Sequence, residues 1–248
     1  MGEGALRSIR RVRLFVVVGL AIGCAALMAM PASAAPTTLP GIDVSHYNGK
    51  PDWTKVKAAG TRFVIAKVTE ATTFLDDHYA NNKAQVEALG LAFTAYHFAR
   101  PDTSAGDAVA EADWFVTNAH LTGKNLLPVL DLEDSGGLGV KKLTRWTQDW
   151  LNEVQAKLGV KAIIYTSTPF WKSFMGNTTW FASNGYPLWI ARWTNVAQLT
   201  LPAANWGGQG WTLWQYSNAG TVDGIATAID QDRYNGTGLA ALKIKNNR

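Results

Sequence analysis

Residues 125–137 read NLLPVLDLEDSGG, an apolar run that ends abruptly in acids. The run is typical of a buried β-strand, and its end carries Asp131 and, two positions later, Glu133. Side chains at positions i and i+2 of a strand point to the same face, about 6.6 Å apart along the backbone. This stretch therefore predicts a strand that presents two carboxyl groups together at its carboxyl end, while Leu132 points to the other face.

Short runs rich in β-branched and apolar residues recur along the chain after residue 40. Stretches with helical character separate the first five runs, and this alternation favours an α/β fold with a parallel sheet. Eight strands in one domain predict a closed or nearly closed barrel, and the later strands follow one another with less helix between them. The expected strands cover 41–45, 63–69, 91–98, 126–133, 162–166, 188–193, 212–216 and 226–230, and the expected helices cover 53–59, 77–89, 105–119 and 143–158.

The first 34 residues have the features of a secretory signal peptide. Four arginines precede the apolar stretch 14–30, and Ala32 and Ala34 form the small-residue pattern of a cleavage site. An uncleaved membrane anchor is the alternative, but 17 apolar residues are at the short end for a membrane span. We therefore expect a secreted protein, extracellular or associated with a cell wall, that has no membrane contact once residues 1–34 are removed.

Three segments follow this leader: a short lead-in over residues 35–40, a catalytic barrel domain over 41–238 and a polar tail over 239–248. The leader has four Arg and one Glu, so the formal net charge of +4 falls by 3 to +1 in the remaining chain. This small charge gives no sign of a nucleic-acid partner. Cys24 is the only cysteine and lies in the leader, so the mature chain must be held by its hydrophobic core. No long apolar edge stands out, and we expect a monomer.

Acids, amides and aromatic residues stand at nearly every expected strand end. In barrels of parallel strands the chemistry lies at the carboxyl ends of the strands, so these side chains are expected around one mouth. Aromatic faces stack on sugar rings, and acids and amides bind sugar hydroxyls, so this composition predicts a carbohydrate site. The candidate residues are Asp43, His46, Tyr47, Glu70, Tyr96, His97, Tyr165, Trp189, Arg192, Trp214, Gln215, Tyr216, Asp230 and Asp232.

The paired acids Asp131 and Glu133 suit general-acid catalysis. Two neighbouring carboxyl groups in a partly apolar site resist double ionisation, so the pKa of one of them is raised. A carboxyl group that keeps its proton can protonate the oxygen of a glycosidic bond. Taken alone, the pair would more often be a polar strand end that binds Lys141, Lys142 or the next helix, and the other strand ends favour catalysis instead. The four histidines show no metal-ligand spacing, so neither a metal nor another cofactor is expected.

Several motifs occur in a fixed order along residues 41–234. The first contains Asp43, Val44, Asn48 and Gly49, Gly60 follows, and the others are FVIAKVTE, AYHFARP, PVLDLE, YTS, LWIARW, LWQYS and IDQDRY. In this order the motifs are specific, and the chain resembles the family 25 glycoside hydrolases, the Chalaropsis-type lysozymes.

Two positions depart from the pattern of that family. Ala71 stands where glycine usually follows the acid of the second strand, and this is expected to alter a turn because glycine permits backbone angles that alanine does not. Asp232 stands where the closing motif usually has asparagine, and it is expected to add negative charge beside Asp230 and so to affect its pKa.

The resemblance implies a modified (β/α) TIM-like barrel with eight strands and fewer than eight helices. It also implies hydrolysis of the β-1,4 bond between N-acetylmuramic acid and N-acetylglucosamine in peptidoglycan, with no cofactor. Glu133 would be the general acid and then the base, while Asp131 would orient the substrate's 2-acetamido group as it attacks the anomeric carbon. The remaining implied catalytic acids are Asp43 and Asp230, and the substrate-binding candidates are Tyr96, Tyr165, Trp189, Trp214, Glu70, His46, Arg192 and Gln215.

Three other functions compete with this interpretation, and a purely structural wall protein is the least favoured because acids cluster at the strand ends. A chitinase-like barrel also ends a strand in D-x-E, but its longer pattern D-x-x-D-x-D-x-E needs acids where this chain has Leu126 and Val129. A catalytically inactive glycan-binding domain would keep the aromatic residues and lose the acids, whereas this chain keeps all four acids of the expected cluster.

Overall fold

The structure, a computed structural model, describes residue 1 and residues 38–194 and 199–245. The predicted signal peptide and its cleavage site lie outside these residues. Within the described ranges, no helix has both the length and the hydropathy to cross a membrane.

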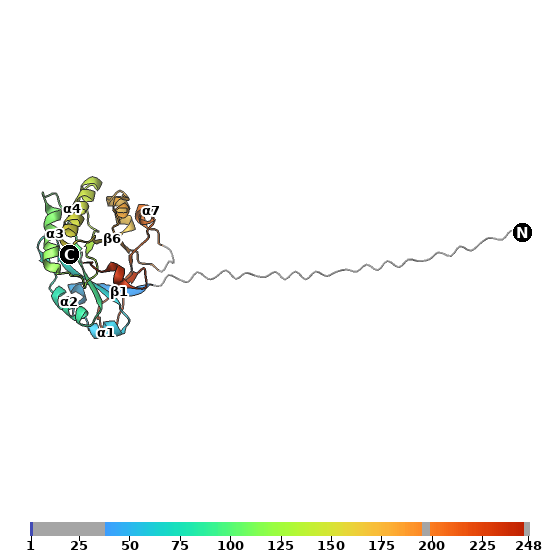
Figure 1. The fold of residues 1–248 in the computed structure, drawn as a ribbon, viewed down its shortest axis with the longest axis horizontal. Helices are drawn as coiled ribbons and strands as arrows, with labels where there is room; N and C mark the ends of the chain where they lie inside the picture. Colours follow the sequence, from blue (N-terminus) through green and yellow to red (C-terminus); the bar gives the residue numbers. More distant parts are fainter. Residues whose placement is uncertain (2–37, 195–198, 246–248) are drawn as a thin grey trace. The chain divides into compact units, whose positions relative to one another are not determined.

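Eight strands close into a barrel (Figure 1). Neighbouring pairs from β1 round to β8 are parallel, and β9 closes the barrel by pairing antiparallel with both β8 and β1. A two-residue strand, β3 (Phe74–Leu75), pairs only with the end of β2. The barrel strands are β1 (Leu39–Val44), β2 (Phe63–Glu70), β4 (Ala92–Phe98), β5 (Val129–Asp131), β6 (Ile163–Ser167), β7 (Leu188–Ala191), β8 (Leu213–Gly220) and β9 (Ile229–Tyr234). The predicted eight-stranded barrel is confirmed.

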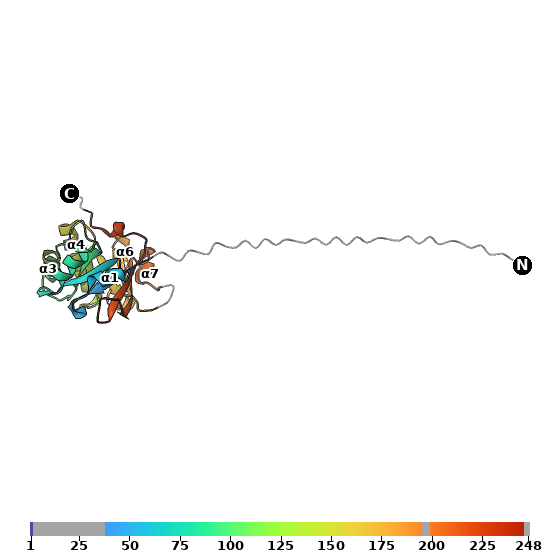
Figure 2. The same ribbon diagram turned by 90° about the horizontal axis from the view of Figure 1, so that it is seen from below.

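Seven α-helices and two 3-10 helices occur in the described part of the chain, which confirms the prediction of fewer than eight helices. The α-helices are α1 (Trp53–Ala58), α2 (Tyr79–Ala88), α3 (Asp107–Ala119), α4 (Val140–Leu158), α5 (Thr168–Phe174), α6 (Trp180–Ser183) and α7 (Pro202–Gly207), and the 3-10 helices are η1 (His46–Asn48) and η2 (Leu239–Leu242). The two longest helices, α3 and α4, pack side by side (Figure 2).

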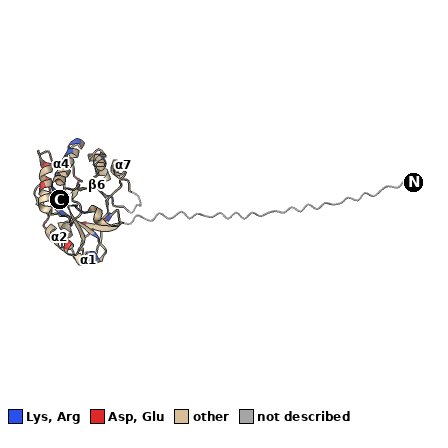
Figure 3. Cartoon of the chain, viewed as in Figure 1, with Lys and Arg blue, Asp and Glu red and all other residues tan. Residues whose placement is uncertain are grey.

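The sequence of α4 explains its packing. Leu143, Trp146, Trp150 and Val154 are buried and recur every three or four positions, so they form one apolar face. Gly159 ends the helix in the left-handed conformation, which glycine adopts at little cost. In the view of Figure 3, basic residues of α4 lie near acidic residues of α3, and the Lys157–Asp113 ion pair of 2.9 Å joins the two helices.

Two hydrophobic layers lie on opposite sides of the barrel wall. Along β2, Phe63 and Ile65 belong to the layer inside the barrel, whereas Val64 and Ala66 belong to the layer beneath the helices. A strand that is buried on both faces reads as a continuous apolar run, as FVIAKV does here. The same alternation decides which residues of every other strand face the interior.

Some strand boundaries differ from the prediction. The strand expected over 126–133 is regular only over β5, because Pro128 just before it has no N–H for a sheet hydrogen bond. The last strand covers 229–234 instead of 226–230, and along this length it pairs with both β8 and β1. β1 begins at Leu39, inside the expected lead-in.

The expected polar tail contributes to the core. Leu242 and Ile244 are buried, and the Leu127 N–H donates to the Leu242 carbonyl at 2.7 Å. Leu127 precedes β5, so this segment packs at the barrel end opposite the carboxyl ends of the parallel strands. We call those carboxyl ends the mouth of the barrel.

Candidate active site

β5 delivers Asp131 and Glu133 to the mouth. The Ala99 N–H donates to the Asp131 carbonyl, and the Leu132 N–H donates to the Tyr165 carbonyl, both at 3.0 Å, so the strand end is held on both sides. Leu132 packs in the outer layer, and Asp131 therefore faces the interior. Asp131 is only 7% exposed, whereas Glu133 is exposed. The pair joins an interior carboxyl group to one that reaches solvent.

Both carboxyl groups of this pair have pKa values above their ordinary ones. Burial raises the pKa of Asp131 well above its ordinary value, and the charges of Glu133 and Asp43 raise it further. Burial also raises the pKa of Glu133, Arg100 opposes this shift, and the charge of Asp230 adds to it. Glu133 therefore holds its proton to higher pH than an ordinary glutamic acid does, although it is open to solvent.

Asp43 and Asp230 join the cluster from the seam between β1 and β9, where they are direct partners in the antiparallel register. Burial, followed by the charge of Asp230, raises the pKa of Asp43 to about 8. Burial raises the pKa of Asp230 to about 6. The charges of Asp43, Glu133 and Asp230 each raise the pKa of another member of the cluster, and two of them raise that of Asp131, so the structure brings the four predicted catalytic acids together.

Gln215 orients Asp43 from β8. Its Oε1 accepts hydrogen bonds from the Tyr165 hydroxyl and from Trp193 Nε1, both at 3.0 Å, and its Nε2 donates to Asp43 Oδ2 at 2.9 Å. Because a side-chain amide has one accepting and one donating end, the two donors determine which end faces Asp43. Gln215 and Tyr165 are almost fully buried, so their place is beneath the acids, where they position the cluster.

Asp232 and Trp189 lie deeper in the barrel. β9 runs antiparallel to its neighbours, so its second acid is farther from the mouth than Asp230 and lies opposite Gly41. Trp189 Nε1 donates to Asp232 Oδ1 at 2.9 Å, and both side chains are buried. Burial raises the pKa of Asp232 well above its ordinary value, which opposes the extra negative charge expected at this position. The prediction that Trp189 lines a sugar subsite is wrong, because its ring is only 2% exposed.

Trp214 lies outside the barrel. It precedes Gln215 on β8, and adjacent strand residues face opposite sides. Its side chain packs in the outer layer, and its Nε1 donates to the Arg192 carbonyl at 2.8 Å. The prediction that Trp214 lines a sugar subsite is therefore wrong. Tyr96 packs against the inner layer near the acids, and Arg192 follows β7 as an exposed residue at the mouth.

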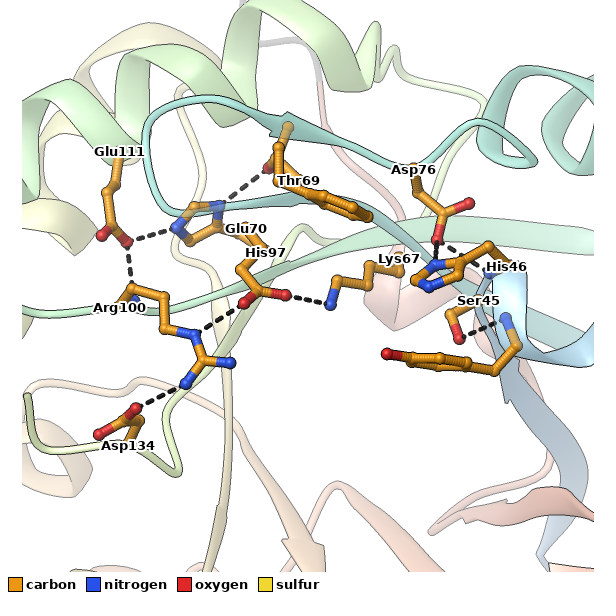
Figure 4. A network of polar contacts seen from close by, with 12 residues as sticks. Ser45, His46, Lys67, Thr69, Glu70, Asp76, His97, Arg100, Glu111 and Asp134 are labelled. Carbon is orange, nitrogen blue, oxygen red and sulfur yellow. Dashed lines mark hydrogen bonds and ion pairs between the residues drawn. The ribbon is translucent and has the colours of Figure 1, made fainter.

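Other aromatic side chains are exposed at the mouth. Tyr47 is 78% exposed and Phe74 is 39% exposed, and of the two only Tyr47 is among the candidates expected at the strand ends. The His46 ring lies between them, with centroid separations of 4.1 Å and 5.6 Å. Buried Asp76 accepts from the His46 backbone N–H at 2.9 Å and contacts its Nδ1 at 2.8 Å (Figure 4). These three rings form an aromatic shelf beside the ends of β1 and β2.

Glu70 lies in a line of alternating charges at the end of β2 (Figure 4). Its carboxylate pairs with Lys67 Nζ at 2.6 Å and with Arg100 Nε at 2.7 Å, and Arg100 also pairs with Asp134 at 2.7 Å. Burial alone would raise the pKa of Glu70, but the hydrogen bonds and charges of Lys67 and Arg100 outweigh it and lower the pKa. Sequence reasoning missed Lys67 and Arg100, although a lysine inside the buried run FVIAKVTE is itself unusual.

His97 lies on the outer side of β4 and is not part of the mouth. Its ring contacts Thr69 Oγ1 at 2.8 Å and Glu111 Oε2 at 2.7 Å (Figure 4). Burial lowers the pKa of His97 to about 3 and raises that of Glu111 to about 8. Burial thus favours the neutral form of each side chain, and the contact joins β4 to α3 as a buried polar link.

Ala71, the first departure from the family pattern, has φ of 50°. This is the left-handed region, which costs an L-residue with a Cβ about 1–2 kcal/mol. The Ala71 N–H nevertheless donates to the Phe98 carbonyl at 3.3 Å. The turn therefore keeps the conformation that suits glycine. Alanine does not alter the turn as expected, and it introduces local backbone strain instead.

Raised pKa values and two nearby cations offset the repulsion between the close acids. Among the described residues, no three His, Cys, Asp or Glu side chains are grouped as metal ligands. The raised pKa values reduce the negative charge of the cluster, and Lys67 and Arg100 lower the pKa of Glu133.

Known proteins resemble this chain over most of its length. The sequence profile described as Glycosyl hydrolases family 25 matches residues 42–225. Lysozyme M1 of Streptomyces globisporus is 35% identical over 216 residues, which cover 84% of this chain and 71% of that protein. The N,O-diacetylmuramidase of Chalaropsis sp is 31% identical over 205 residues, which cover 78% of this chain and 94% of that protein.

Solved structures share the barrel. The bacterial lysozyme from Streptomyces coelicolor matches with a TM-score of 0.77 and 33% identity, covering 84% of this chain and 97% of the other. The family GH25 lysozyme from Aspergillus fumigatus matches with a TM-score of 0.76 and 28% identity, covering 84% and 100%. The family profile ends before Asp230 and Asp232, so the position of these two acids rests on the structure.

Proposed function

This chain belongs to family 25 of the glycosyl hydrolases, and we propose that it is a secreted lysozyme that cuts peptidoglycan by substrate-assisted acid/base catalysis. The bond it hydrolyses is the β-1,4 bond between N-acetylmuramic acid and N-acetylglucosamine. Residues 1–34 direct its export, and the mature chain acts on the cell wall as a monomer. The relatives named lysozyme and muramidase support the hydrolase activity.

The observation that carries the mechanism is the pairing of Asp131 and Glu133 at the end of β5. Glu133 is exposed and its pKa is raised, so it can offer a proton to a bound substrate. Asp131 is only 7% exposed and lies beside Glu133 at the same strand end. A proton donor next to a carboxyl group that can accept a hydrogen bond is what cleavage assisted by the substrate's acetamido group needs.

In the first step, Glu133 gives its proton to the glycosidic oxygen as the bond to the anomeric carbon breaks. The carbonyl oxygen of the substrate's 2-acetamido group attacks that carbon and forms a cyclic intermediate. The Asp131 carboxylate accepts the acetamido N–H, which aligns the attacking oxygen, and its negative charge stabilises the positive charge that develops there. In the second step, Glu133 takes a proton from the water that opens the intermediate, and the starting state returns.

The remaining residues of the mouth prepare this chemistry. Asp230 keeps the pKa of Glu133 high, whereas Arg100 limits the rise so that the proton can still leave. Tyr96, Arg192 and the aromatic shelf are placed to contact the sugars on either side of the cleaved bond.

The test is a digest of purified peptidoglycan by the wild-type protein and by Glu133→Gln, with the fragments reduced and analysed by mass spectrometry. Glutamine keeps the shape but has no acidic proton, so hydrolysis is expected to fall by about 10²- to 10⁴-fold while wall binding is retained. Glu153→Gln on α4 is the matched control, because it makes the same chemical change on the outside of the barrel.

Each result has a separate meaning. Fragments that end in N-acetylmuramitol from the wild type and the control, but not from Glu133→Gln, support a muramidase with Glu133 as its acid. Fragments that end in N-acetylglucosaminitol would replace the muramidase with a glucosaminidase. Binding without cleavage by the wild type would identify an inactive glycan-binding domain and overturn the proposal.

A further inference from the structure

Asp232 and Asp43 lie on the same inner surface of the barrel. In the register of β9 with β1, Asp232 is opposite Gly41 and Asp230 is opposite Asp43. Gly41 has no side chain, and the Phe63 ring occupies the space where its Cβ would lie. The Asp232 carboxyl group contacts that of Asp43, two residues along β1. Both acids are buried, with exposures of 0% and 6%.

The hydrogen-bond donors around this pair are too few for two carboxylates. Asp43 Oδ2 accepts from Gln215 Nε2 at 2.9 Å, and Asp232 Oδ1 accepts from Trp189 Nε1 at 2.9 Å. Asp232 Oδ2 is buried and has no donor among the described residues, and no lysine or arginine of that part of the chain forms an ion pair with either acid. Two ionised carboxyl groups here would repel each other without the water or cations that offset such a cost.

We propose that Asp232 keeps its proton throughout the working pH range and donates it to Asp43, and that it is thereby a positioning residue for the catalytic cluster. The proton lies on Asp232 Oδ2, so this buried oxygen becomes a hydroxyl that donates to Asp43 and no longer lacks a partner. Asp43 is then held from two sides, by the amide of Gln215 and by the acid of Asp232. The donated proton is what allows Asp43, the nearer of the two to the mouth, to ionise in place of Asp232.

The surrounding groups agree with this order of ionisation. Burial and then Asp43 raise the pKa of Asp232 well above its ordinary value, whereas the hydrogen bonds from Gln215 and Asp232 restrain the pKa of Asp43 to about 8. The other groups facing the pair are Asp230 on β9, Asp131 and Glu133 at the end of β5, Tyr96 on β4, Tyr165 on β6 and Trp189 on β7. None of them is a cation, and the carboxyl groups among them make a second negative charge more costly.

An asparagine at position 232 would make the same two contacts, because its Oδ1 can accept from Trp189 and its Nδ2 can donate to Asp43. It cannot ionise in the unfolded chain, however, whereas Asp232 does so near pH 3.9, at about its ordinary pKa. Unfolding of the wild-type protein above that pH therefore releases a proton, and its stability falls relative to Asp232→Asn as the pH rises.

The first measurement is urea unfolding of the wild type and Asp232→Asn between about pH 4.5 and pH 7.5, above the ordinary pKa of an aspartic acid. The ratio of their folding equilibrium constants is expected to shift in favour of the asparagine variant by up to about tenfold per pH unit. Asp149→Asn on α4 is the control, because this acid is partly exposed and pairs with Arg145. For this variant, the ratio of folding equilibrium constants is not expected to shift with pH in this way. A ratio that does not change with pH would overturn the proposal, since Asp232 would then be ionised in the folded protein.

The second measurement is the pH dependence of peptidoglycan hydrolysis, and this arm rests on the proposed function. Asp232→Asn is expected to keep the wild-type pH profile, whereas Asp232→Leu, which has no donor, lowers kcat by about tenfold or more and moves the ionisation of Asp43 to higher pH. Loss of activity in both variants alike would contradict a role as hydrogen-bond donor. An inactive wild type would refute the proposed function but leave the unfolding test intact.

A third measurement covers the case in which Asp232→Asn fails to fold. The side-chain carboxyl carbon of Asp232 in the unmutated protein can be followed by nuclear magnetic resonance across the same pH range. A resonance that stays at the protonated position supports the proposal, and one that titrates near its ordinary pKa of about 3.9 overturns it.

Discussion

Two strand ends of this barrel carry acids at the same spacing, and they place them differently. On β5, Asp131 is buried and Glu133, two residues later, is exposed at the mouth. On β9, Asp230 is near the mouth and Asp232, two residues later, is completely buried. β5 runs toward the mouth and β9 runs away from it. The second acid of the pair is therefore the one nearer to the mouth at the end of β5 and the one farther from it on β9.

The comparison teaches that an i, i+2 pair of acids indicates a shared face but not a shared depth. The deeper acid of each pair has a pKa well above its ordinary value because of burial, and it serves best as a hydrogen-bond partner. The acid nearer to solvent has a more moderate shift and can exchange protons with substrate or water. The predictions below test this division of roles, from the largest expected effect to the smallest.

Asp131→Asn tests the deeper acid of β5. Asparagine can still accept a hydrogen bond from the acetamido group, but it cannot become negative as positive charge develops there. We expect kcat for peptidoglycan to fall by about 10²- to 10³-fold, with KM little changed. Asp134→Asn, which removes an exposed acid three residues away, is the control for charge alone. Wild-type rates in Asp131→Asn would remove this residue from the mechanism.

Asp230→Asn tests the acid of β9 that lies near the mouth. Asp230 raises the pKa of Glu133, so its loss lowers that pKa and Glu133 gives up its proton at lower pH. The alkaline limb of kcat/KM is therefore expected to move to lower pH by up to about one unit, with a smaller loss at the optimum than in Asp131→Asn. A loss as large as that of Glu133→Gln would show that Asp230 takes part directly in the reaction.

Ala71→Gly extends the comparison to β2, where the terminal acid Glu70 is neutralised by Lys67 and Arg100. Glycine relieves the left-handed strain at position 71, which its greater freedom in the unfolded chain partly offsets. We expect the free energy of unfolding to rise by about 0.5–1 kcal/mol with activity unchanged, as measured by urea denaturation and peptidoglycan digestion.

The control for this effect is Ala84→Gly, in the middle of α2, where the backbone is helical and the side chain is exposed. There the same substitution should lower the free energy of unfolding by about 0.5–1 kcal/mol. If both variants changed stability in the same direction, backbone strain at Ala71 would not be the cause.

Local patterns were sufficient to predict much of this protein. Apolar runs of strand length, separated by helical stretches, indicated the barrel, because burial on both faces of a parallel strand demands such runs. The spacing of Asp131 and Glu133 placed both on one face, since side chains alternate along any strand. These features depend only on the chemistry of neighbouring residues, and the structure agrees with them.

The depth and the charge of each residue depended on the whole barrel. Trp214 faces outward and Trp189 lies too deep to reach a sugar, and a strand read alone does not indicate which of its faces is the interior. The antiparallel direction of β9 buries Asp232, and the ion pairs of Glu70 join β2 to the segment after β4. Sequence by itself determined which residues share a face, because that follows from local backbone geometry. Only the tertiary structure decided which of them meet solvent and which keep their protons, because burial and charge proximity arise from strands far apart in the chain.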